Sequence, residues 1–300
     1  IPAMSNKFRF FLPFFACFPL FGGCDGGDAG GGVPIVTEAW RLGGFEAPES
    51  VAYNPAMEVF YVSNINGNPV EKDGNGYIST VTNAGVLLER KWLDGLNAPK
   101  GMAVTDDTLL VADIDELLAI NLSDRSITRF AAPGARFLND VAIDAKGRVY
   151  VSDTMDDAIY RLEDGNLSLW LKSPELEAPN GLLAESSRLV VAAWGVMTEG
   201  FATDTPGHLK TVSLADKSLS SLGSGEPIGN LDGVEADVFG RYLATDWMAG
   251  KLYRISSGGE ATLLLGLDQG SADLEFLPRE NLAVIPMMLN GTIVAYHLGG

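Results

Sequence analysis

The sequence predicts an all-β fold, a six-bladed β-propeller closed by an N-terminal strand. Its 300 residues include 35 glycines spread along the chain and 46% hydrophobic residues, which is typical of many short strands around a large core. A strand-and-turn pattern recurs six times. A strand-like segment also precedes the first repeat, while the last repeat is one strand short. The alternative fold is an open sandwich of the same strands, but it would not explain why the six repeats begin in the same phase.

The repeats are recognised by their first residues. Each begins with a short loop, a residue expected to face the central channel, a small or acidic residue and an apolar strand. The channel-facing residues are 51, 39, 41, 52 and 40 positions apart. The six starts are Pro48-Glu49-Ser50-Val51, Pro99-Lys100-Gly101-Met102, Leu138-Asn139-Asp140-Val141, Pro179-Asn180-Gly181-Leu182, Leu231-Asp232-Gly233-Val234 and Ser271-Ala272-Asp273-Leu274.

Four antiparallel strands are expected per repeat, because repeats of about 40 to 50 residues with four strands are typical of propeller blades. Second strands that end in polar turns are expected at 59–64, 109–113, 149–153, 189–193, 242–246 and 282–286. Third strands are clearest at 158–162 and 251–255, and a fourth at 167–171. The last repeat ends with a third strand at 292–298. We expect the segment 35–42 to complete it, which would remove an exposed sheet edge.

The beginning of the sequence predicts export. Lys7 and Arg9 precede a twelve-residue apolar stretch from Phe10 to Phe21, which is followed by Gly22, Gly23 and Cys24. A basic start, a short apolar region and small residues are the parts of a signal peptide. The stretch is shorter than the roughly 17 to 25 residues that span a bilayer as a helix.

The two glycines before Cys24 resemble a bacterial lipobox, in which the cysteine is lipidated. The domain prediction is therefore a lipoprotein-type signal peptide at 1–23, a lipidated Cys24 with a glycine-rich tether at 24–34, and the propeller at 35–300. The expected location is the bacterial periplasm or cell surface, with the lipid anchored in a membrane. An ordinary secretory signal with an incidental cysteine is the alternative.

Charge and cysteine content exclude several functions. The formal net charge of −18 is carried without acidic runs, which indicates a solvated surface. No basic stripe is available to neutralise phosphates, so nucleic acid is not expected as a partner. The only cysteines, Cys17 and Cys24, lie ahead of the predicted propeller. Its body therefore has neither a disulfide framework nor a thiol nucleophile.

One position of the repeat is expected to form a ring at the channel mouth. Its residues are Glu49, Lys100, Asn139, Asn180, Asp232 and Ala272. Two carboxylates and two amides thus converge on one point. Calcium takes 6 to 8 oxygen ligands, which these four side chains could supply together with water or substrate. With no thiolate or histidine in the ring, zinc is not favoured. The ring predicts a site for Ca²⁺, with another divalent metal as the alternative.

Two features of the ring have a second interpretation. Asn-Gly, Asp-Gly and Asn-Asp pairs are also preferred in turns for backbone reasons. Turn preference does not account for Glu49 in the same register. Lys100 could pair with Glu49 or Asp232 in place of the metal, bind an acidic substrate, or extend along the channel wall to the rim.

The ring motifs resemble those of the senescence marker protein/gluconolactonase/luciferin-regenerating enzyme family. The similarity spans the six repeats, and extends to diisopropylfluorophosphatase and the paraoxonases, which share a six-bladed calcium hydrolase plan. The resemblance implies that Glu49, Asn139, Asn180 and Asp232 hold the metal, and that Asp232 is also the base or nucleophile. It places Arg136 near a substrate-binding arginine of gluconolactonase-like members, although a surface loop arginine is the alternative.

Long loops are expected to surround this mouth. Segments 65–76 and 195–207 separate second and third strands, so they emerge on the face where the first strands begin. They would wall a pocket with Trp194, Met197 and Phe201, joined by Trp247, unless these side chains cap the rims between blades. The residues expected to bind substrate are Lys100, Arg136, Asp140 and Trp194.

The sequence therefore predicts a Ca²⁺-dependent hydrolase of lactones, esters or related small molecules. The alternative is a non-catalytic propeller that binds a ligand or protein, with a structural metal or none, because a propeller alone does not choose between them. The two histidines, His208 and His297, lie outside the ring register, and no Ser-His-Asp triad is expected.

Overall fold

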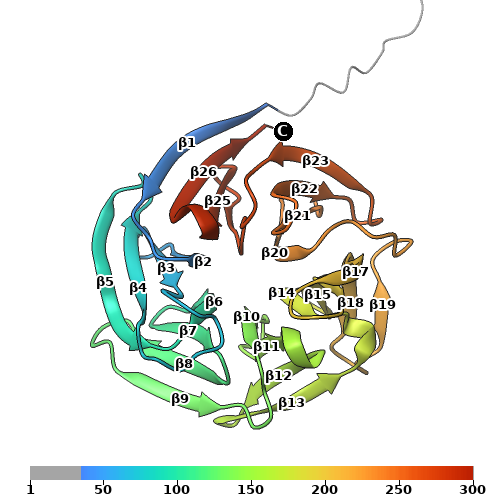
Figure 1. The fold of residues 1–300 in the computed structure, drawn as a ribbon, viewed down its shortest axis with the longest axis horizontal. Coiled ribbons are helices and arrows are strands. Elements are labelled where there is room, and N and C mark those ends of the chain that lie inside the picture. Colours follow the sequence, from blue (N-terminus) through green and yellow to red (C-terminus); the bar gives the residue numbers. More distant parts are fainter. Residues whose placement is uncertain (1–34, 300) are drawn as a thin grey trace, which may run out of the picture. The chain divides into compact units, whose positions relative to one another are not determined.

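In the computed structural model, which describes residues 35–299, six four-stranded antiparallel sheets surround a central channel (Figure 1). The fold is the predicted six-bladed β-propeller. Within the described residues, no helix has the length and apolar character needed to cross a membrane. The predicted signal peptide, Cys24 and the tether lie outside this range.

Each blade runs from an innermost strand at the channel to an outermost strand at the rim. The first three blades contain β2 (Pro48–Asn54), β3 (Val59–Asn64), β4 (Gly76–Thr82) and β5 (Leu87–Leu96); β6 (Pro99–Val104), β7 (Thr108–Asp113), β8 (Glu116–Asn121) and β9 (Ile127–Ala131); and β10 (Leu138–Ile143), β11 (Val149–Asp153), β12 (Ala158–Glu163) and β13 (Asn166–Lys172). The 3₁₀ turns η1 (Thr154–Asp156) and η2 (Pro174–Leu176) flank the outer strands of the third blade.

The other blades follow the same plan. They contain β14 (Pro179–Ala184), β15 (Arg188–Ala193), β18 (Leu209–Ser213) and β19 (Leu219–Ser221); β20 (Leu231–Ala236), β21 (Tyr242–Asp246), β22 (Lys251–Ile255) and β23 (Ala261–Gly266); and β24 (Glu275–Leu277), β25 (Leu282–Met287) and β26 (Thr292–Leu298) with β1 (Val36–Gly43). A separate hairpin, β16 (Gly195–Met197) and β17 (Thr203–Pro206), stands between β15 and β18, and η3 (Met288–Asn290) follows β25.

The ring is closed as predicted, because β1 is the outermost strand of the sixth blade. It pairs with β26 in antiparallel register from Val36 opposite Leu298 to Gly43 opposite Thr292. The first strand of the propeller thereby covers the edge that the last strand would otherwise expose (Figure 1). Both ends of the propeller are held in one sheet.

The predicted strands agree with the structure to within about one residue, with one exception. The innermost strand of the sixth blade begins at Glu275, four residues after the expected start at Ser271. The backbone of the intervening residues bonds elsewhere: Ala272 N–H donates to Pro286 O at 3.0 Å and Asp273 N–H to Glu49 O at 3.0 Å. The segment joins the sixth blade to the first.

The hydrophobic core lies between blades. Each large cluster draws its side chains from two neighbouring sheets, as where Phe60 and Val62 of β3 meet Val284 of β25 and Ile293 of β26. Each blade presents apolar residues on both faces, so an isolated blade would expose this apolar surface to water. Stability therefore depends on the complete ring.

Trp40 of β1 tests this dependence. Its indole N–H donates to Asn83 O at 3.0 Å and its ring lies 6.2 Å from that of Phe60, both in the first blade. We expect Trp40→Ala to lower the free energy of unfolding by about 2 kcal/mol, because a half-buried aromatic contact and a hydrogen bond are lost together. Urea unfolding would measure the change. Trp40→Phe should retain roughly half of this energy, and an equal loss in both variants would contradict the packing contribution.

Candidate functional site

A recurring bulge aims the ring residues into the channel. In the first five blades the register between the innermost and second strands shifts around the ring position, as between Pro48 and Val51 or between Leu231 and Val234. An extra residue in one strand bends it and turns side chains out of the regular alternation. These bulges interrupt the ladder and leave backbone groups to be satisfied by side chains.

Acidic and amide side chains at the end of the second strands hold the loops that lead into the ring. Asp113 accepts hydrogen bonds from the backbone N–H groups of Asn97 and Ala98 at 2.9 and 2.7 Å. Asp153 accepts those of Arg136 and Phe137 at 2.8 and 2.9 Å. The sequence marked these positions only as polar turns. Their recurrence at the same point of the repeat was the signal for a positioning role.

Hydroxyl groups of the second strands satisfy the backbone at the bulges and connect blades. Ser152 Oγ accepts from Asp140 N–H at 2.9 Å and donates to the carbonyl of Asn180 in the next blade at 2.6 Å. Thr245 Oγ1 likewise accepts from Gly233 N–H at 3.0 Å and donates to Ala272 O at 2.9 Å. These bonds fix the third blade to the fourth, and the fifth to the sixth, at the ring positions.

The glycines after ring residues serve close packing and not a turn. A Cβ on Gly181 would lie 2.2 Å from Asp232 O, and one on Gly101 would lie 2.4 Å from Asp140 Oδ1. Neither glycine has a positive φ angle. Asn180 and Asp232 lie within strands β14 and β20. The Asn-Gly and Asp-Gly pairs thus reflect the close approach of neighbouring blades, which leaves no room for a side chain at Gly181 or Gly233.

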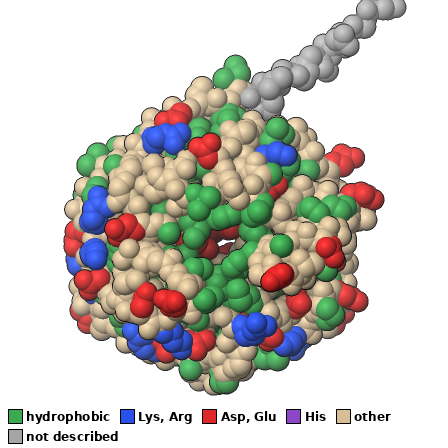
Figure 2. Space-filling view, viewed as in Figure 1, with side chains coloured by type: hydrophobic (Ala, Val, Ile, Leu, Met, Phe, Trp, Pro, Cys, Tyr) green, Lys and Arg blue, Asp and Glu red, His purple; other side chains and the backbone are tan. Residues whose placement is uncertain are grey.

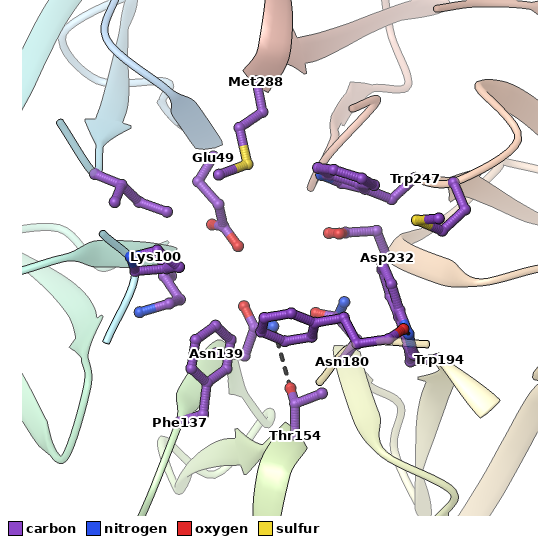
Figure 3. A pocket seen from close by; sticks show the side chains of 14 residues that line it. Glu49, Lys100, Phe137, Asn139, Thr154, Asn180, Trp194, Asp232, Trp247 and Met288 are labelled. Atoms are coloured by element: carbon purple, nitrogen blue, oxygen red, sulfur yellow. Dashed lines mark hydrogen bonds between the residues drawn. The ribbon is translucent and has the colours of Figure 1, made fainter. Parts of the chain in front are cut away.

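Five of the six ring residues line one pocket with a volume of about 120 Å³. Glu49, Lys100, Asn139, Asn180 and Asp232 come from the five successive innermost strands β2, β6, β10, β14 and β20, and Thr154 of η1 joins them (Figure 3). Ala272, the sixth ring residue, is fully buried. The pocket thus contains all four residues that were predicted to hold a metal.

The two ring carboxylates each present a buried oxygen without a partner. Within the described residues, Glu49 Oε2 and Asp232 Oδ1 accept no hydrogen bond, although both residues are about 95% buried (5% and 4% exposed). Burial, followed by repulsion from Asp232, raises the pKa of Glu49 well above its usual range. Burial, followed by repulsion from Asp273, does the same to the pKa of Asp232. The charge of Lys100 offsets only part of this rise at Glu49.

The ring meets the chemical requirements of a hard cation. Asn139 Nδ2 donates to Thr154 Oγ1 at 3.1 Å, which leaves the amide oxygen directed into the pocket (Figure 3). Unpartnered carboxylate oxygens and amide oxygens are the donors that Ca²⁺ takes. In residues 35–299, no group of three or more His, Cys, Asp or Glu side chains is arranged to bind a metal. Binding here would therefore use the amides and water besides the two carboxylates.

Lys100 does not occupy the centre of the ring. Its Nζ donates to Ala98 O at 2.9 Å and lies 4.4 Å from the centroid of the Phe137 ring. Within the described residues it forms no ion pair with Glu49 or Asp232. Burial lowers the pKa of Lys100 to about 8, although the Glu49 and Asp113 carboxylates favour its charged form. The side chain borders the pocket without bonding directly to either carboxylate.

Two residues expected to bind substrate lie outside the pocket. Asp140 is directed between innermost strands, where its carboxylate accepts from Val141 N–H at 2.7 Å and Leu182 N–H at 2.6 Å. Arg136 Nη1 donates to Met155 O at 3.2 Å in an exposed loop. The structure thus brings only Lys100 and Trp194 of that group to the pocket lining.

Aromatic side chains form a continuous wall above the ring. Phe137 meets Phe201 edge-on at 5.4 Å, and Trp194 lies 6.2 Å from Phe201 and 6.1 Å from Trp247. The expected contribution of both long loops is present, since Ile65 and Phe201 line the pocket. Met197 instead faces a separate pocket beside Glu177. The apolar ring around the opening is visible in Figure 2.

His208, outside the ring, lies beside a serine and a glutamate. His208 Nε2 lies 2.9 Å from Ser221 Oγ, and its Nδ1 lies 4.0 Å from Glu177 Oε2. The same carboxylate oxygen is 3.1 Å from Lys210 Nζ. Burial and the Lys210 charge lower the pKa of His208. Lys210 opposes the charged imidazole that a catalytic triad would form.

Comparison with known proteins supports the fold. No protein-family model and no curated protein matches the sequence. A gluconolactonase from Xanthomonas campestris is 16% identical, covers 89% of this chain and 90% of its own, and superposes with a TM-score of 0.67. A second structure assigned to the gluconolactonases is 17% identical over 90% and 93%, also at 0.67. Virginiamycin B lyase from Staphylococcus aureus is 12% identical over 88% and 99%, at 0.58. The same fold thus occurs in proteins with different activities.

Carboxylates deeper in the channel make stability depend on pH. Burial raises the pKa of Glu275 to about 7, although Tyr53 N–H donates to its carboxylate at 2.8 Å. The folded protein then holds a proton that the unfolded chain releases between about pH 4.5 and 7, so stability falls as pH rises through this range. Glu275→Gln removes this titrating group, so the free energy of unfolding should fall by about 1 kcal/mol less between pH 5 and 8. The effect is kept small because the partly exposed carboxylate is screened by solvent.

Urea unfolding at both pH values in a chelating buffer would measure this difference. Glu260→Gln, on an exposed turn, is the matched control and should leave the pH dependence unchanged. An unchanged pH dependence in Glu275→Gln would show that Glu275 is already ionised in the folded protein at pH 5.

Proposed function

We propose that this protein hydrolyses lactones, esters or related small molecules at the channel mouth with the help of bound Ca²⁺ or another divalent cation. The observation that carries the proposal is the pair of buried, unpartnered carboxylate oxygens of Glu49 and Asp232 in a pocket that also contains two amides. Titratable groups with strongly shifted pKa values in a cleft are typical of functional sites. The propeller shared with gluconolactonases is consistent with this chemistry.

Four side chains would hold the cation: Glu49, Asn139, Asn180 and Asp232. When bound, a divalent cation polarises a carbonyl oxygen and favours attack on its carbon. In their ionised form, Glu49 and Asp232 would balance the charge of the cation. Trp194 and Trp247, at the side of the pocket, would reduce the access of bulk water.

Asp232 has a second role in this proposal, as the proton acceptor. One of its oxygens would accept a proton from the attacking water as the water oxygen bonds to the carbonyl carbon. The bond between that carbon and the ring or ester oxygen then breaks, and Asp232 returns the proton to the leaving oxygen. The product is a hydroxy acid, or an acid and an alcohol. Lys100, whose pKa is about 8 and which lines the pocket, would attract the new carboxylate.

We also propose that the protein is exported and held at a membrane by lipidated Cys24, on the support of the N-terminal sequence pattern. Such an anchor would let the channel mouth meet small substrates in the periplasm or at the cell surface. The competing function is a non-catalytic binding propeller. Ligand binding by the protein without any hydrolysis would favour it.

Calcium binding is the first expected outcome. Calorimetry should show that the protein binds Ca²⁺, and that Glu49→Ala and Asp232→Ala each weaken binding by roughly 100-fold, because each removes a charged ligand. Binding should release protons and weaken as the pH falls, since both carboxylates have raised pKa values before the cation arrives. Asp106→Ala removes an exposed turn carboxylate and serves as the control. Absence of divalent-metal binding would contradict a metal-dependent site.

Catalysis by Asp232 is tested separately. We expect Asp232→Asn to lower kcat for hydrolysis by about 10²–10⁴-fold, even at Ca²⁺ concentrations that saturate the site, because the amide cannot accept the proton. Release of acid from a lactone at constant pH would measure the rate. Full recovery of activity at high Ca²⁺ would instead limit Asp232 to metal binding.

A further inference from the structure

The pocket walls offer few hydrogen-bonding side chains. Eight of the fourteen lining residues are apolar or aromatic, among them Phe137, Trp194, Phe201 and Trp247. The indole N–H of Trp194 is already used, because it donates to Phe201 O at 2.9 Å. Among the described residues, Trp247 carries the one side-chain donor of this wall for which no partner is present. Hydroxyl groups along a ligand would therefore lose water without gaining partners.

The polar groups are confined to the base of the pocket. They belong to the five ring residues and Thr154. Part of their bonding capacity is already used within the protein: Thr154 Oγ1 donates to Pro179 O at 2.8 Å, and Lys100 Nζ donates to Ala98 O. A compact polar head is accommodated there. The rest of the ligand must lie against the aromatic wall.

The entrance has the same character. Figure 2 shows hydrophobic side chains gathered around the central opening, with acidic groups visible inside it. Phe201 and Met248 of the lining are 37% and 43% exposed, so apolar surface continues from the pocket to solvent. A ligand meets an apolar surface before it reaches the carboxylates.

We infer that the pocket selects lactones or esters with an apolar body over polyhydroxylated sugar lactones. This inference rests on the hydrolase function proposed above and names its substrate class. One water molecule needs about 10–15 Å³ of cavity volume. The pocket volume of about 120 Å³ therefore takes a ligand of about ten non-hydrogen atoms. δ-Octalactone has this size, and glucono-δ-lactone has the same six-membered ring with hydroxyl groups in place of the alkyl chain.

Binding is measured first, with lactams that the proposed reaction does not consume. The probes are 6-propylpiperidin-2-one and gluconolactam, titrated into the Ca²⁺-loaded protein and followed by tryptophan fluorescence. We expect the propyl lactam to bind at least about tenfold more tightly, because the buried hydroxyls of gluconolactam lack partners. Equal affinities, tighter binding of gluconolactam, or no binding of the propyl lactam would overturn the inference.

A matched pair of variants locates the preference. Phe201→Asn replaces an exposed phenylalanine of the pocket wall and leaves its carbonyl bond to Trp194 available. Phe239→Asn makes the same change at a residue that is 72% exposed and does not line the pocket. We expect Phe201→Asn to weaken propyl lactam binding about five- to tenfold and Phe239→Asn to leave it unchanged. The same effect in both, or in neither, contradicts selection by this wall.

Turnover then separates this inference from the proposed function. We expect kcat/KM for δ-octalactone to exceed that for glucono-δ-lactone by about 100-fold, and to fall about threefold for each methylene removed from the chain. Selective binding of the propyl lactam without hydrolysis of either lactone would refute the hydrolase and retain the ligand class. Hydrolysis with preference for glucono-δ-lactone would retain the hydrolase and refute the ligand class.

Discussion

Closure of the ring is the constraint on which the rest of this molecule depends. Each blade has two apolar faces, and only a complete circle of blades covers both. The innermost strands approach so closely that no space remains for a Cβ at Gly101, Gly181 or Gly233. Hydroxyls of the second strands bind carbonyls of the next blade across these contacts. The ring residues therefore hold one arrangement around the channel.

The same crowding creates the electrostatics of the site. Glu49, Asp232 and Asp273 lie buried near one another, and each pKa is raised by loss of solvation, with mutual repulsion adding to the rise in Glu49 and Asp232. Such burial costs stability unless a positive charge accompanies it. Lys100 is turned toward Ala98 O and Phe137 and does not form that pair. The arrangement favours an external cation, and this is the physical basis of the proposed metal-assisted chemistry.

The ring and the loops have different roles. Gluconolactonases and a lyase share the propeller with this chain, so the fold alone does not determine the reaction. The ring provides polar groups at the base, while the segment 65–76 and the β16–β17 hairpin add Ile65 and Phe201 to the wall. Polarity at the base and apolar character at the wall are separate properties, and they can be changed by separate mutations.

The sequence by itself determined the blade count, the closure by the first strand and the membership of the ring. These follow from short-range patterns, because strand alternation and turn spacing repeat in register, so Glu49, Asn139, Asn180 and Asp232 share one place in the repeat. The late start of β24 was not predictable, since the backbone just ahead of it, at Asp273, bonds to Glu49 on a strand more than 200 residues away. Asp140 follows Asn139 directly, yet a bulge and two backbone donors turn it away from the pocket. Only the tertiary structure decided the directions of Asp140, Lys100 and Met197 and the order of the aromatic wall, because those depend on packing between segments that the chain itself does not place together.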